Sequence, residues 1–271
     1  MEGLTQELLF AVENGIATVT LNRPDKRNAL TTSMYEGLHN VLTEVKRNDA
    51  VKVLLLTGNG PGFCAGSDAE ERLLPRIVND RSVPLEKNRS DLLEPVMLYL
   101  APALYSSGKP SIAVINGVAA GAGLSLALLC DIRIASDKAR FGTSWVNIGL
   151  TPDVGATFSL PRIVGLDKAL KLFFTGELID AKEAERINLV TQVVPHDSLM
   201  KTAKELAMKI AKGPSVAIEL AKRAAYHGIV NDFVSQLYFE NYAQNICFAS
   251  QDFKEGVRAF KEKRQPNFTG L

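Results

Sequence analysis

Two glycine-rich turns, each directly after an apolar run, could hold a negatively charged oxygen. They are Gly62-Phe-Cys-Ala-Gly-Ser-Asp68 and Asn116-Gly-Val-Ala-Ala-Gly-Ala-Gly-Leu124. Small residues leave backbone N–H groups open to a ligand in such turns, and the first N–H groups of a helix lack intrahelical partners and carry partial positive charge. The two turns together could form an anion hole, although small residues at strand-to-helix turns also occur for reasons of geometry alone.

Asp153, within Gly149-Leu-Thr-Pro-Asp-Val-Gly155, is a candidate proton-transfer group. An apolar lining that includes Trp145, Leu150 and Phe158 would exclude water and raise the pKa of this acid, which is the usual way in which a carboxylate becomes a base near neutral pH. The alternative is that Asp153, which follows a proline in a turn, only bonds the local backbone.

The elements that would position these residues alternate between strand-like and helix-like patterns. Asn14-Gly15 between two β-rich runs predicts a hairpin, and Ser33 with Glu36 forms a capping-box pattern before helical spacing that continues to Lys46. Continuous apolar runs are typical of strands buried on both faces. The expected strands are 7–12, 16–21, 51–57, 111–115 and 131–135, and an apolar helix is expected over 122–129. This alternation predicts an α/β core with ββα-type units.

The second half is different in character. A strand-like run at 189–194 is followed by helix-like sequence from Asp197, so we divide the chain into an α/β core, residues 1–196, and a helical region, residues 197–271. The charged segment 73–93, with two prolines, is expected to be a loop or short helix, and it could border a substrate pocket or be a solvated insertion.

Composition excludes several classes of protein. The 271 residues carry 31 Lys+Arg against 30 Asp+Glu, without the basic surplus of a nucleic-acid binder. Three dispersed cysteines and three dispersed histidines predict no disulfide framework and no metal site, and they fit a reducing compartment such as the cytoplasm or an organelle matrix. No signal peptide is evident. The uncharged stretch 112–130 is long enough to suggest a membrane span, but Asn116 and its small residues favour a strand, a turn and a buried helix.

Taken in order along the chain, these segments resemble the crotonase, or enoyl-CoA hydratase/isomerase, superfamily. The resemblance covers nearly the whole chain and is carried by Asn22-Arg-Pro-Asp-Lys-Arg-Asn-Ala-Leu30, Phe63–Asp68, Ile115–Gly123, Cys130-Asp131, Ala139–Gly142, Leu160–Gly165 and Glu255–Lys263. It implies a spiral of ββα repeats followed by helices that pack homotrimers, usually paired into hexamers. It also implies acyl-CoA thioester substrates and no metal or redox cofactor.

The resemblance assigns roles by position. The backbone N–H groups of Ala65 and Ala122 would form the oxyanion hole for the thioester carbonyl. Lys26 and Arg27 would contact the phosphates of CoA, and Phe260 and Lys263 would reach the nucleotide on a neighbouring subunit, unless these residues are simply solvated surface. The remaining candidates for substrate binding are Ala29, Gly66, Ser67, Asp68, Gly121, Ser125 and Trp145.

Acid/base residues distinguish the branches of the family. Hydratases use two glutamates, and the matching positions here are Ser125 and Trp145, which disfavours water addition. Asp153 falls where Δ3,Δ2-enoyl-CoA isomerases and the isomerases of phenylacetate breakdown keep a single acid. We therefore expect an isomerase in which Asp153 moves a proton from C2 to C4 of a 3-enoyl-CoA.

Three alternatives stay open. In an aroyl-CoA dehalogenase or hydrolase Asp153 would be a nucleophile beside Trp145, but the histidine expected around residues 94–104 is missing. A hydratase with atypical acid/base residues is the second alternative. A homologue that binds CoA esters without turnover is the third. The acyl group and the pathway do not follow from the sequence.

Overall fold

The computed structural model describes residues 6–78 and 95–271. A six-stranded sheet forms its centre, in the order β1-β2-β3-β5-β7-β10. The strands are β1 (Leu8–Glu13), β2 (Ile16–Leu21), β3 (Val53–Gly58), β5 (Ser111–Ile115), β7 (Ile132–Ser136) and β10 (Gln192–Val194). β1 and β2 form an antiparallel hairpin, and the other neighbours pair in parallel.

A second, smaller sheet carries the predicted turns. It has the order β4-β6-β8-β9, with β4 (Gly62–Cys64), β6 (Val118–Ala120), β8 (Arg140–Gly142) and β9 (Leu178–Asp180). β4, β6 and β8 each follow a strand of the large sheet after only a few residues, so the chain repeatedly passes from the large sheet to the small one. This repetition of two strands and a helix is the ββα spiral that the resemblance predicted.

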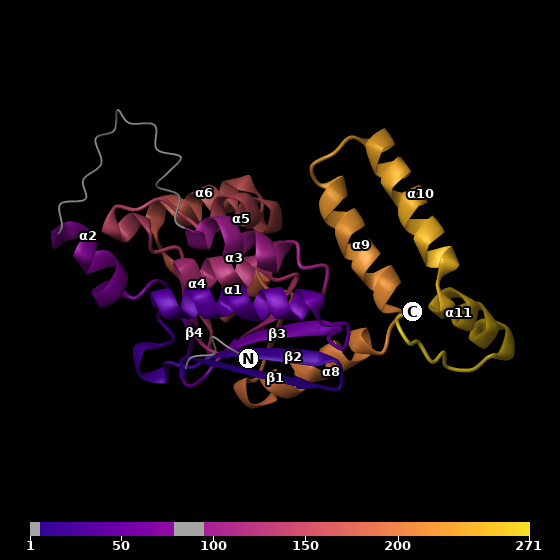
Figure 1. Ribbon diagram of the computed structural model, residues 1–271. Helices are drawn as coiled ribbons and strands as arrows, with labels where there is room; N and C mark the ends of the chain where they lie inside the picture. Colours follow the sequence, from indigo (N-terminus) through magenta and orange to yellow (C-terminus); the bar gives the residue numbers. More distant parts are fainter. Residues whose placement is uncertain (1–5, 79–94) are drawn as a thin grey trace.

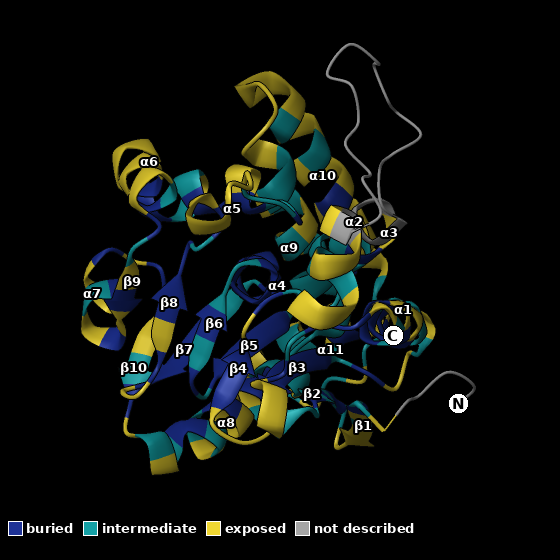
Figure 2. Cartoon of the chain, turned by 90° about the vertical axis from the view of Figure 1, so that its left-hand side faces the viewer, coloured by how far each residue is buried: buried dark blue, intermediate teal, exposed yellow. Residues whose placement is uncertain are grey.

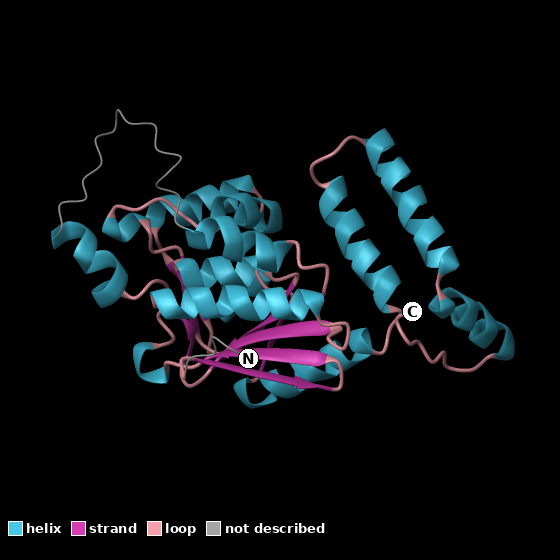
Figure 3. Ribbon diagram, viewed as in Figure 1, coloured by secondary structure: helices cyan, strands magenta, loops and turns pink. Residues whose placement is uncertain are grey.

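Helices cover both faces of the large sheet. In Figures 1 and 3, α1 and α4 lie on one side and α8 lies on the other. The alternating side chains of β3 explain this arrangement, since Leu54 and Leu56 belong to the core under α1 and α4, while Val53 and Leu55 pack with Leu199, Ala203 and Ala207 of α8. Figure 2 shows that the central strands are buried. The helices are α1 (Thr32–Arg47), α2 (Leu74–Val78), α3 (Pro95–Tyr105), α4 (Ala122–Leu129), α5 (Ala156–Val164), α6 (Leu166–Thr175), α7 (Ala181–Arg186), α8 (Leu199–Ala211), α9 (Ser215–Gly228), α10 (Phe233–Ala249) and α11 (Gln251–Glu262).

A buried polar cluster joins the C-terminal helices to the sheet. Lys222 Nζ of α9 lies 2.8 Å from Asp131 Oδ2, and Tyr226 Oη donates to Asp131 Oδ1 at 2.7 Å. Ser111 adds hydrogen bonds to Oδ2 from its backbone N–H and its hydroxyl, at 2.7 and 2.9 Å. Beyond this cluster α9 and α10 extend side by side away from the sheet (Figure 1).

Most predicted elements agree with the structure, within a few residues at their ends. The predicted helix start was wrong by two residues, because Thr31 is the N-cap and accepts from the Met34 N–H, whereas the Ser33 hydroxyl donates to Glu7. The uncharged stretch 112–130 forms β5, β6 and α4, and within the described residues no helix is long and apolar enough to span a membrane. Residues 79–94 of the charged segment lie outside the described residues. The predicted boundary at residue 196 falls just before α8, which packs on the sheet, and the division into two domains stays a prediction.

Candidate active site

The first turn differs from the expectation at Ala65. The Ala65 N–H donates to the Arg27 carbonyl at 2.9 Å, so this amide is already used inside the protein and the assignment of Ala65 to the oxyanion hole was wrong. Two residues later, the Ser67 N–H has no hydrogen-bond acceptor among the described residues. The Gly66 N–H between them is directed to the Cys64 sulfur, so the Ser67 N–H is the vacant amide that follows it in this turn.

The direction of the Ser67 N–H is fixed by its own peptide unit. The Gly66 carbonyl accepts from the Leu30 N–H at 2.8 Å. Because the peptide is planar and trans, the N–H on the same unit points the opposite way, away from Leu30. Gly66 has φ +104°, a conformation that favours glycine, which explains why the turn carries glycine at this position.

The second turn is built in the same way. The Gly121 carbonyl accepts from the Ser125 N–H at 3.0 Å within the first turn of α4, so the Ala122 N–H points out of the start of the helix. Gly121 has φ +51°. The predicted role of Ala122 is compatible with this geometry.

The two turns meet closely. A Cβ placed on Gly66 would lie 3.6 Å from the Ala122 nitrogen, and one placed on Gly123 would collide with the Cys64 carbonyl. Glycine at these positions therefore allows β4 and the start of α4 to approach until the Ser67 and Ala122 amides are neighbours. Both amides are backbone donors in a partly buried setting, an arrangement that suits a developing oxyanion.

Asp153 lies beside this pair of turns. Trp145 Nε1 donates to Asp153 Oδ1 at 3.0 Å, and a Cβ on Gly121 would lie 4.0 Å from that same nitrogen. Asp153 Oδ2 makes no hydrogen bond or ion pair to another residue in the described part of the chain. One carboxylate oxygen is thus held by the indole, and the other has no partner among the other described residues.

Burial raises the pKa of Asp153 above the usual aspartate range. It outweighs the Trp145 hydrogen bond, the aspartate's own backbone N–H and the charge of Arg72, which all favour the ionised form. Trp145 itself is 4% exposed and packs edge-on against Phe173. The carboxyl is therefore in the apolar setting that makes an aspartate a stronger base.

The side chains of Ser125 and Asp68 both make contacts within the protein, and their predicted role in substrate binding stays a prediction. The Ser125 side chain is fully buried, and its hydroxyl lies 3.0 Å from the Asp153 carbonyl and 3.4 Å from the Gly121 carbonyl, so it links the segment of Asp153 to the start of α4. Asp68 pairs with Arg23 at 2.8 Å and caps the chain at Glu70 and Glu71. Burial opposes ionisation of Asp68, but these hydrogen bonds outweigh it and lower its pKa.

Two residues that the sequence analysis did not single out lie next to the site. The Tyr35 hydroxyl of α1 is 3.1 Å from Ser67 Oγ, and the guanidinium of Arg72 lies 4.6 Å from the centre of the Tyr35 ring. The charges of Arg72 and Asp153 both act on Tyr35. Tyr35 was missed because it falls among the core-facing positions of an amphipathic helix, where an aromatic residue predicts packing only.

The basic candidates lie in a loop that is hydrogen-bonded to the first turn, whereas the C-terminal candidates lie far from it (Figure 1). Ala29, which accepts from Arg23 at 2.6 Å, and the exposed Lys26 and Arg27 belong to the loop after β2. Phe260, 86% exposed, and Lys263 lie at the end of α11, which in Figure 1 is at the opposite end of the molecule from β4. Their contacts with CoA stay predictions.

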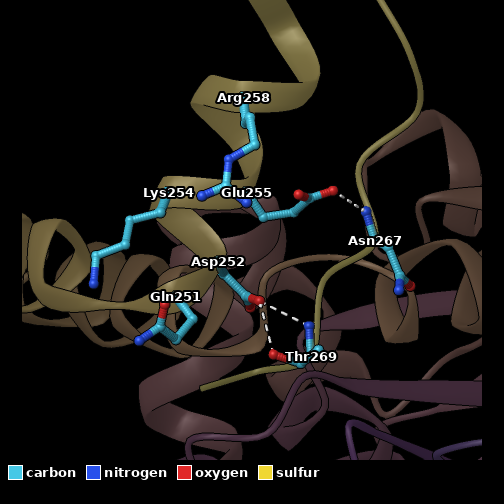
Figure 4. Close-up of a pocket in the computed structure, with 7 residues that line it drawn as sticks. All are labelled: Gln251, Asp252, Lys254, Glu255, Arg258, Asn267 and Thr269. Atoms are coloured by element: carbon cyan, nitrogen blue, oxygen red, sulfur yellow. Dashed lines mark hydrogen bonds between the residues drawn. The ribbon is translucent and has the colours of Figure 1, made fainter. Parts of the chain in front are cut away.

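A pocket of about 400 Å³ at the start of α11 is shown in Figure 4. It is lined by Lys254 and Arg258 and by two acids that hold the C-terminal tail. Asp252 accepts from the N–H groups of Thr269 and Gly270, and Glu255 accepts from that of Asn267. Both acids therefore have a structural use in this pocket. Within the described residues no group of His, Cys, Asp or Glu could hold a metal ion.

Comparisons with known proteins agree with this architecture. The family model for enoyl-CoA hydratase/isomerase matches residues 11–271. The chain is 39% identical over 266 residues to 1,2-epoxyphenylacetyl-CoA isomerase of Escherichia coli K12, covering 97% of this chain and 98% of the relative. It is 40% identical over 263 residues to short-chain-enoyl-CoA hydratase of Clostridium acetobutylicum, covering 95% of each. The crystal structure of enoyl-CoA hydratase from Bacillus anthracis superposes with a TM-score of 0.86 at 34% identity, covering 98% and 100% of the two chains. On the fold, the paired turns and these matches, the chain belongs to the enoyl-CoA hydratase/isomerase family of the crotonase superfamily.

Proposed function

We propose that this member of a family acting on CoA esters is an acyl-CoA isomerase that converts a 3-enoyl-CoA to the conjugated 2-enoyl-CoA. The observation that carries the proposal is a single open carboxylate oxygen, Asp153 Oδ2, beside two vacant backbone amides. One base and one oxyanion hole are sufficient for an allylic proton shift, which consumes no water.

Asp153 alone can carry out both proton transfers of the reaction. Its carboxylate takes the proton from C2, and the electrons of the C2–H bond form a dienolate whose negative charge rests on the thioester oxygen. The same carboxyl group then returns the proton to C4, the double bond forms between C2 and C3, and the carbonyl is restored. Burial, which raises the pKa of Asp153, matches it to both steps.

The Ser67 and Ala122 amides would stabilise the dienolate oxygen. Removing one preorganised donor of this type typically costs about 2.7–4 kcal/mol of transition-state stabilisation. Each donor belongs to a peptide whose carbonyl is hydrogen-bonded on the other side, to Leu30 or to Ser125. This holds the amides in place before the charge develops, so little reorganisation is needed during the reaction.

The surroundings of Asp153 favour isomerisation over hydration. Hydration needs one group that activates water and another that delivers a proton. Ser125 is fully buried behind the aspartate, and the Trp145 indole is occupied as a donor to Oδ1. Neither position can supply the second acid. The relatives' names include both an isomerase and a hydratase, so the direct assay decides between the two reactions.

The test offers purified protein 3-hexenoyl-CoA, 2-hexenoyl-CoA and 4-chlorobenzoyl-CoA in parallel. We expect the conjugated product from the first, with part of the C2 proton recovered at C4 in D2O because a shielded carboxyl carries it. Asp153→Asn should abolish the reaction, whereas Asp167→Asn, at an exposed position, should not change it. Hydration of 2-hexenoyl-CoA at a comparable rate would refute the proposal, and chloride release would instead favour Asp153 as a nucleophile.

A further inference from the structure

The hydroxyl of Tyr35 reaches the oxyanion turn from a different element of the fold. Tyr35 lies on α1, is 2% exposed, and has its oxygen 3.1 Å from Ser67 Oγ. The rest of its ring lies within the main hydrophobic core. A tyrosine placed for packing alone would not need its polar atom at the residue that carries the vacant amide.

The surroundings keep this hydroxyl protonated and in place. Burial is the main cause that raises the pKa of Tyr35 to about 12, against the lowering effects of the Ser67 hydrogen bond and the Arg72 charge. Arg72 covers the ring face, and Arg72 Nη1 also donates to Thr32 Oγ1 at 3.2 Å on the same helix. The ring is therefore held between the core and a cation, with little freedom to move its oxygen away from Ser67.

Backbone hydrogen bonds hold the residues on either side of Ser67, but within the described part of the chain no backbone hydrogen bond holds Ser67 itself. The Gly66 carbonyl accepts from the Leu30 N–H, and the Asp68 N–H donates to the Leu30 carbonyl at 2.9 Å. These bonds hold the chain before and after Ser67. The side-chain contact with Tyr35 supplies a third anchor at the residue itself, and three anchors define the direction of the Ser67 N–H more closely than two.

We propose that Tyr35 is a positioning residue of the oxyanion hole, which acts through the Ser67 hydroxyl to hold the Ser67 amide toward the thioester oxygen. The inference rests on the proposed use of the two turns as an oxyanion hole. It does not depend on whether the reaction is isomerisation or hydration, because both build negative charge on the same oxygen.

The first test is spectroscopic and needs no turnover. Hexanoyl-CoA labelled with 13C at the carbonyl is bound to the protein, and its C=O stretching frequency is measured by difference infrared spectroscopy. Hydrogen bonds from the turns should lower the frequency in the wild type. In Tyr35→Phe, which keeps the ring and the Arg72 contact, part of that shift should be lost, while Tyr105→Phe should retain all of it. Tyr105 is a suitable control because its ring packs on Tyr226 and its hydroxyl bonds no described residue.

The second test is a double-mutant cycle on 3-hexenoyl-CoA. Loss of one hydrogen bond of ordinary net strength predicts a fall of about three- to tenfold in turnover for Tyr35→Phe. The fall should appear in kcat more than in KM, since the negative charge on the thioester oxygen is absent from the bound substrate and develops on the way to the dienolate. Ser67→Ala should give a similar fall, and the double variant should be no slower than either single variant.

The outcomes separate this inference from the proposed isomerase. Unchanged carbonyl frequency and kcat in Tyr35→Phe, or losses that add in the double variant, would overturn the role of Tyr35. A wild-type protein that fails to isomerise 3-hexenoyl-CoA, yet shows the Tyr35-dependent carbonyl shift, would overturn the isomerase and leave the positioning role standing.

Discussion

Replacing Trp145 by phenylalanine is expected to move the acid limb of the pH–rate profile upward. The indole Nε1–H donates to Asp153 Oδ1 at 3.0 Å and is one of the interactions that favour the ionised carboxylate. Trp145 is 4% exposed, so water has poor access to replace the lost donor. Without the indole, one interaction that lowers the pKa of Asp153 is lost, so burial raises this pKa further.

The size of this shift follows from the strength of the hydrogen bond. A hydrogen bond to a charged group contributes about 1.5–3 kcal/mol. Since one pKa unit corresponds to about 1.36 kcal/mol, the pKa of Asp153 should rise by about one to two units. The base must be ionised to act, so activity below the new pKa falls and the acid limb moves to higher pH by the same amount.

The assay is kcat/KM for 3-hexenoyl-CoA as a function of pH, which reports the ionisation of the free enzyme. Phe173→Leu is the packing control, because Phe173 contacts the Trp145 ring edge-on with centroids 6.4 Å apart and donates nothing to the carboxylate. The control should keep the wild-type acid limb. An unmoved acid limb in Trp145→Phe, or one displaced to lower pH, would show that the indole does not govern the ionisation of Asp153.

The remaining predictions concern stability and are read from thermal or urea unfolding. Asp153→Asn should raise the free energy of unfolding at neutral pH. Folding raises the pKa of Asp153, so the folded wild type binds more protons than the unfolded chain and loses stability as the pH rises through that pKa. The advantage of the variant should vanish below about pH 4, where Asp153 is protonated in both states of the wild type. Gly123→Ala should cost about 1–3 kcal/mol through collision with the facing strand, whereas Gly256→Ala, where an added methyl group would make only ordinary contact with Phe268, should be neutral or stabilising. Lys222→Met should cost about 1.5–3 kcal/mol, because the partly buried Asp131 carboxylate loses its cation while the hydrogen bonds from Ser111 and Tyr226 stay in place. Its neighbour Arg223→Met, which breaks only an exposed helix pair, should cost less than about 1 kcal/mol, and equal losses for the two would contradict the assigned role of the buried cluster.

Long elements of the fold could be predicted from the sequence, and short ones could not. Five strands of the large sheet, β1, β2, β3, β5 and β7, and the helix 122–129 have five or more residues each, which suffice to show their period. β4, β6, β8 and β9 have three residues each, too few to show alternation, so the small sheet was not predicted. The two turns lie together because β4 and β6 are neighbours in that sheet, and this pairing could not be predicted from the sequence.

The candidate site was predicted in outline and corrected in detail. Ala122 and Asp153 lie together, as their positions in the family suggested. The choice of Ala65 over Ser67 failed because a sequence does not state which amide of a turn is already bonded, here to Arg27. Ser125 could not be recognised as a buried support, since a serine in a small-residue run fits a lining position equally well.

The backbone origin of both vacant amides has a consequence for how this protein can change over evolutionary time. Because both amides belong to the main chain, most substitutions of the surrounding side chains keep these two donors, and only those that shift the turns themselves, such as loss of the Tyr35 hydroxyl in the proposal above, would weaken them. Under the proposed function, a lineage could exchange one set of acids for another and still retain the two donors proposed for the thioester oxygen.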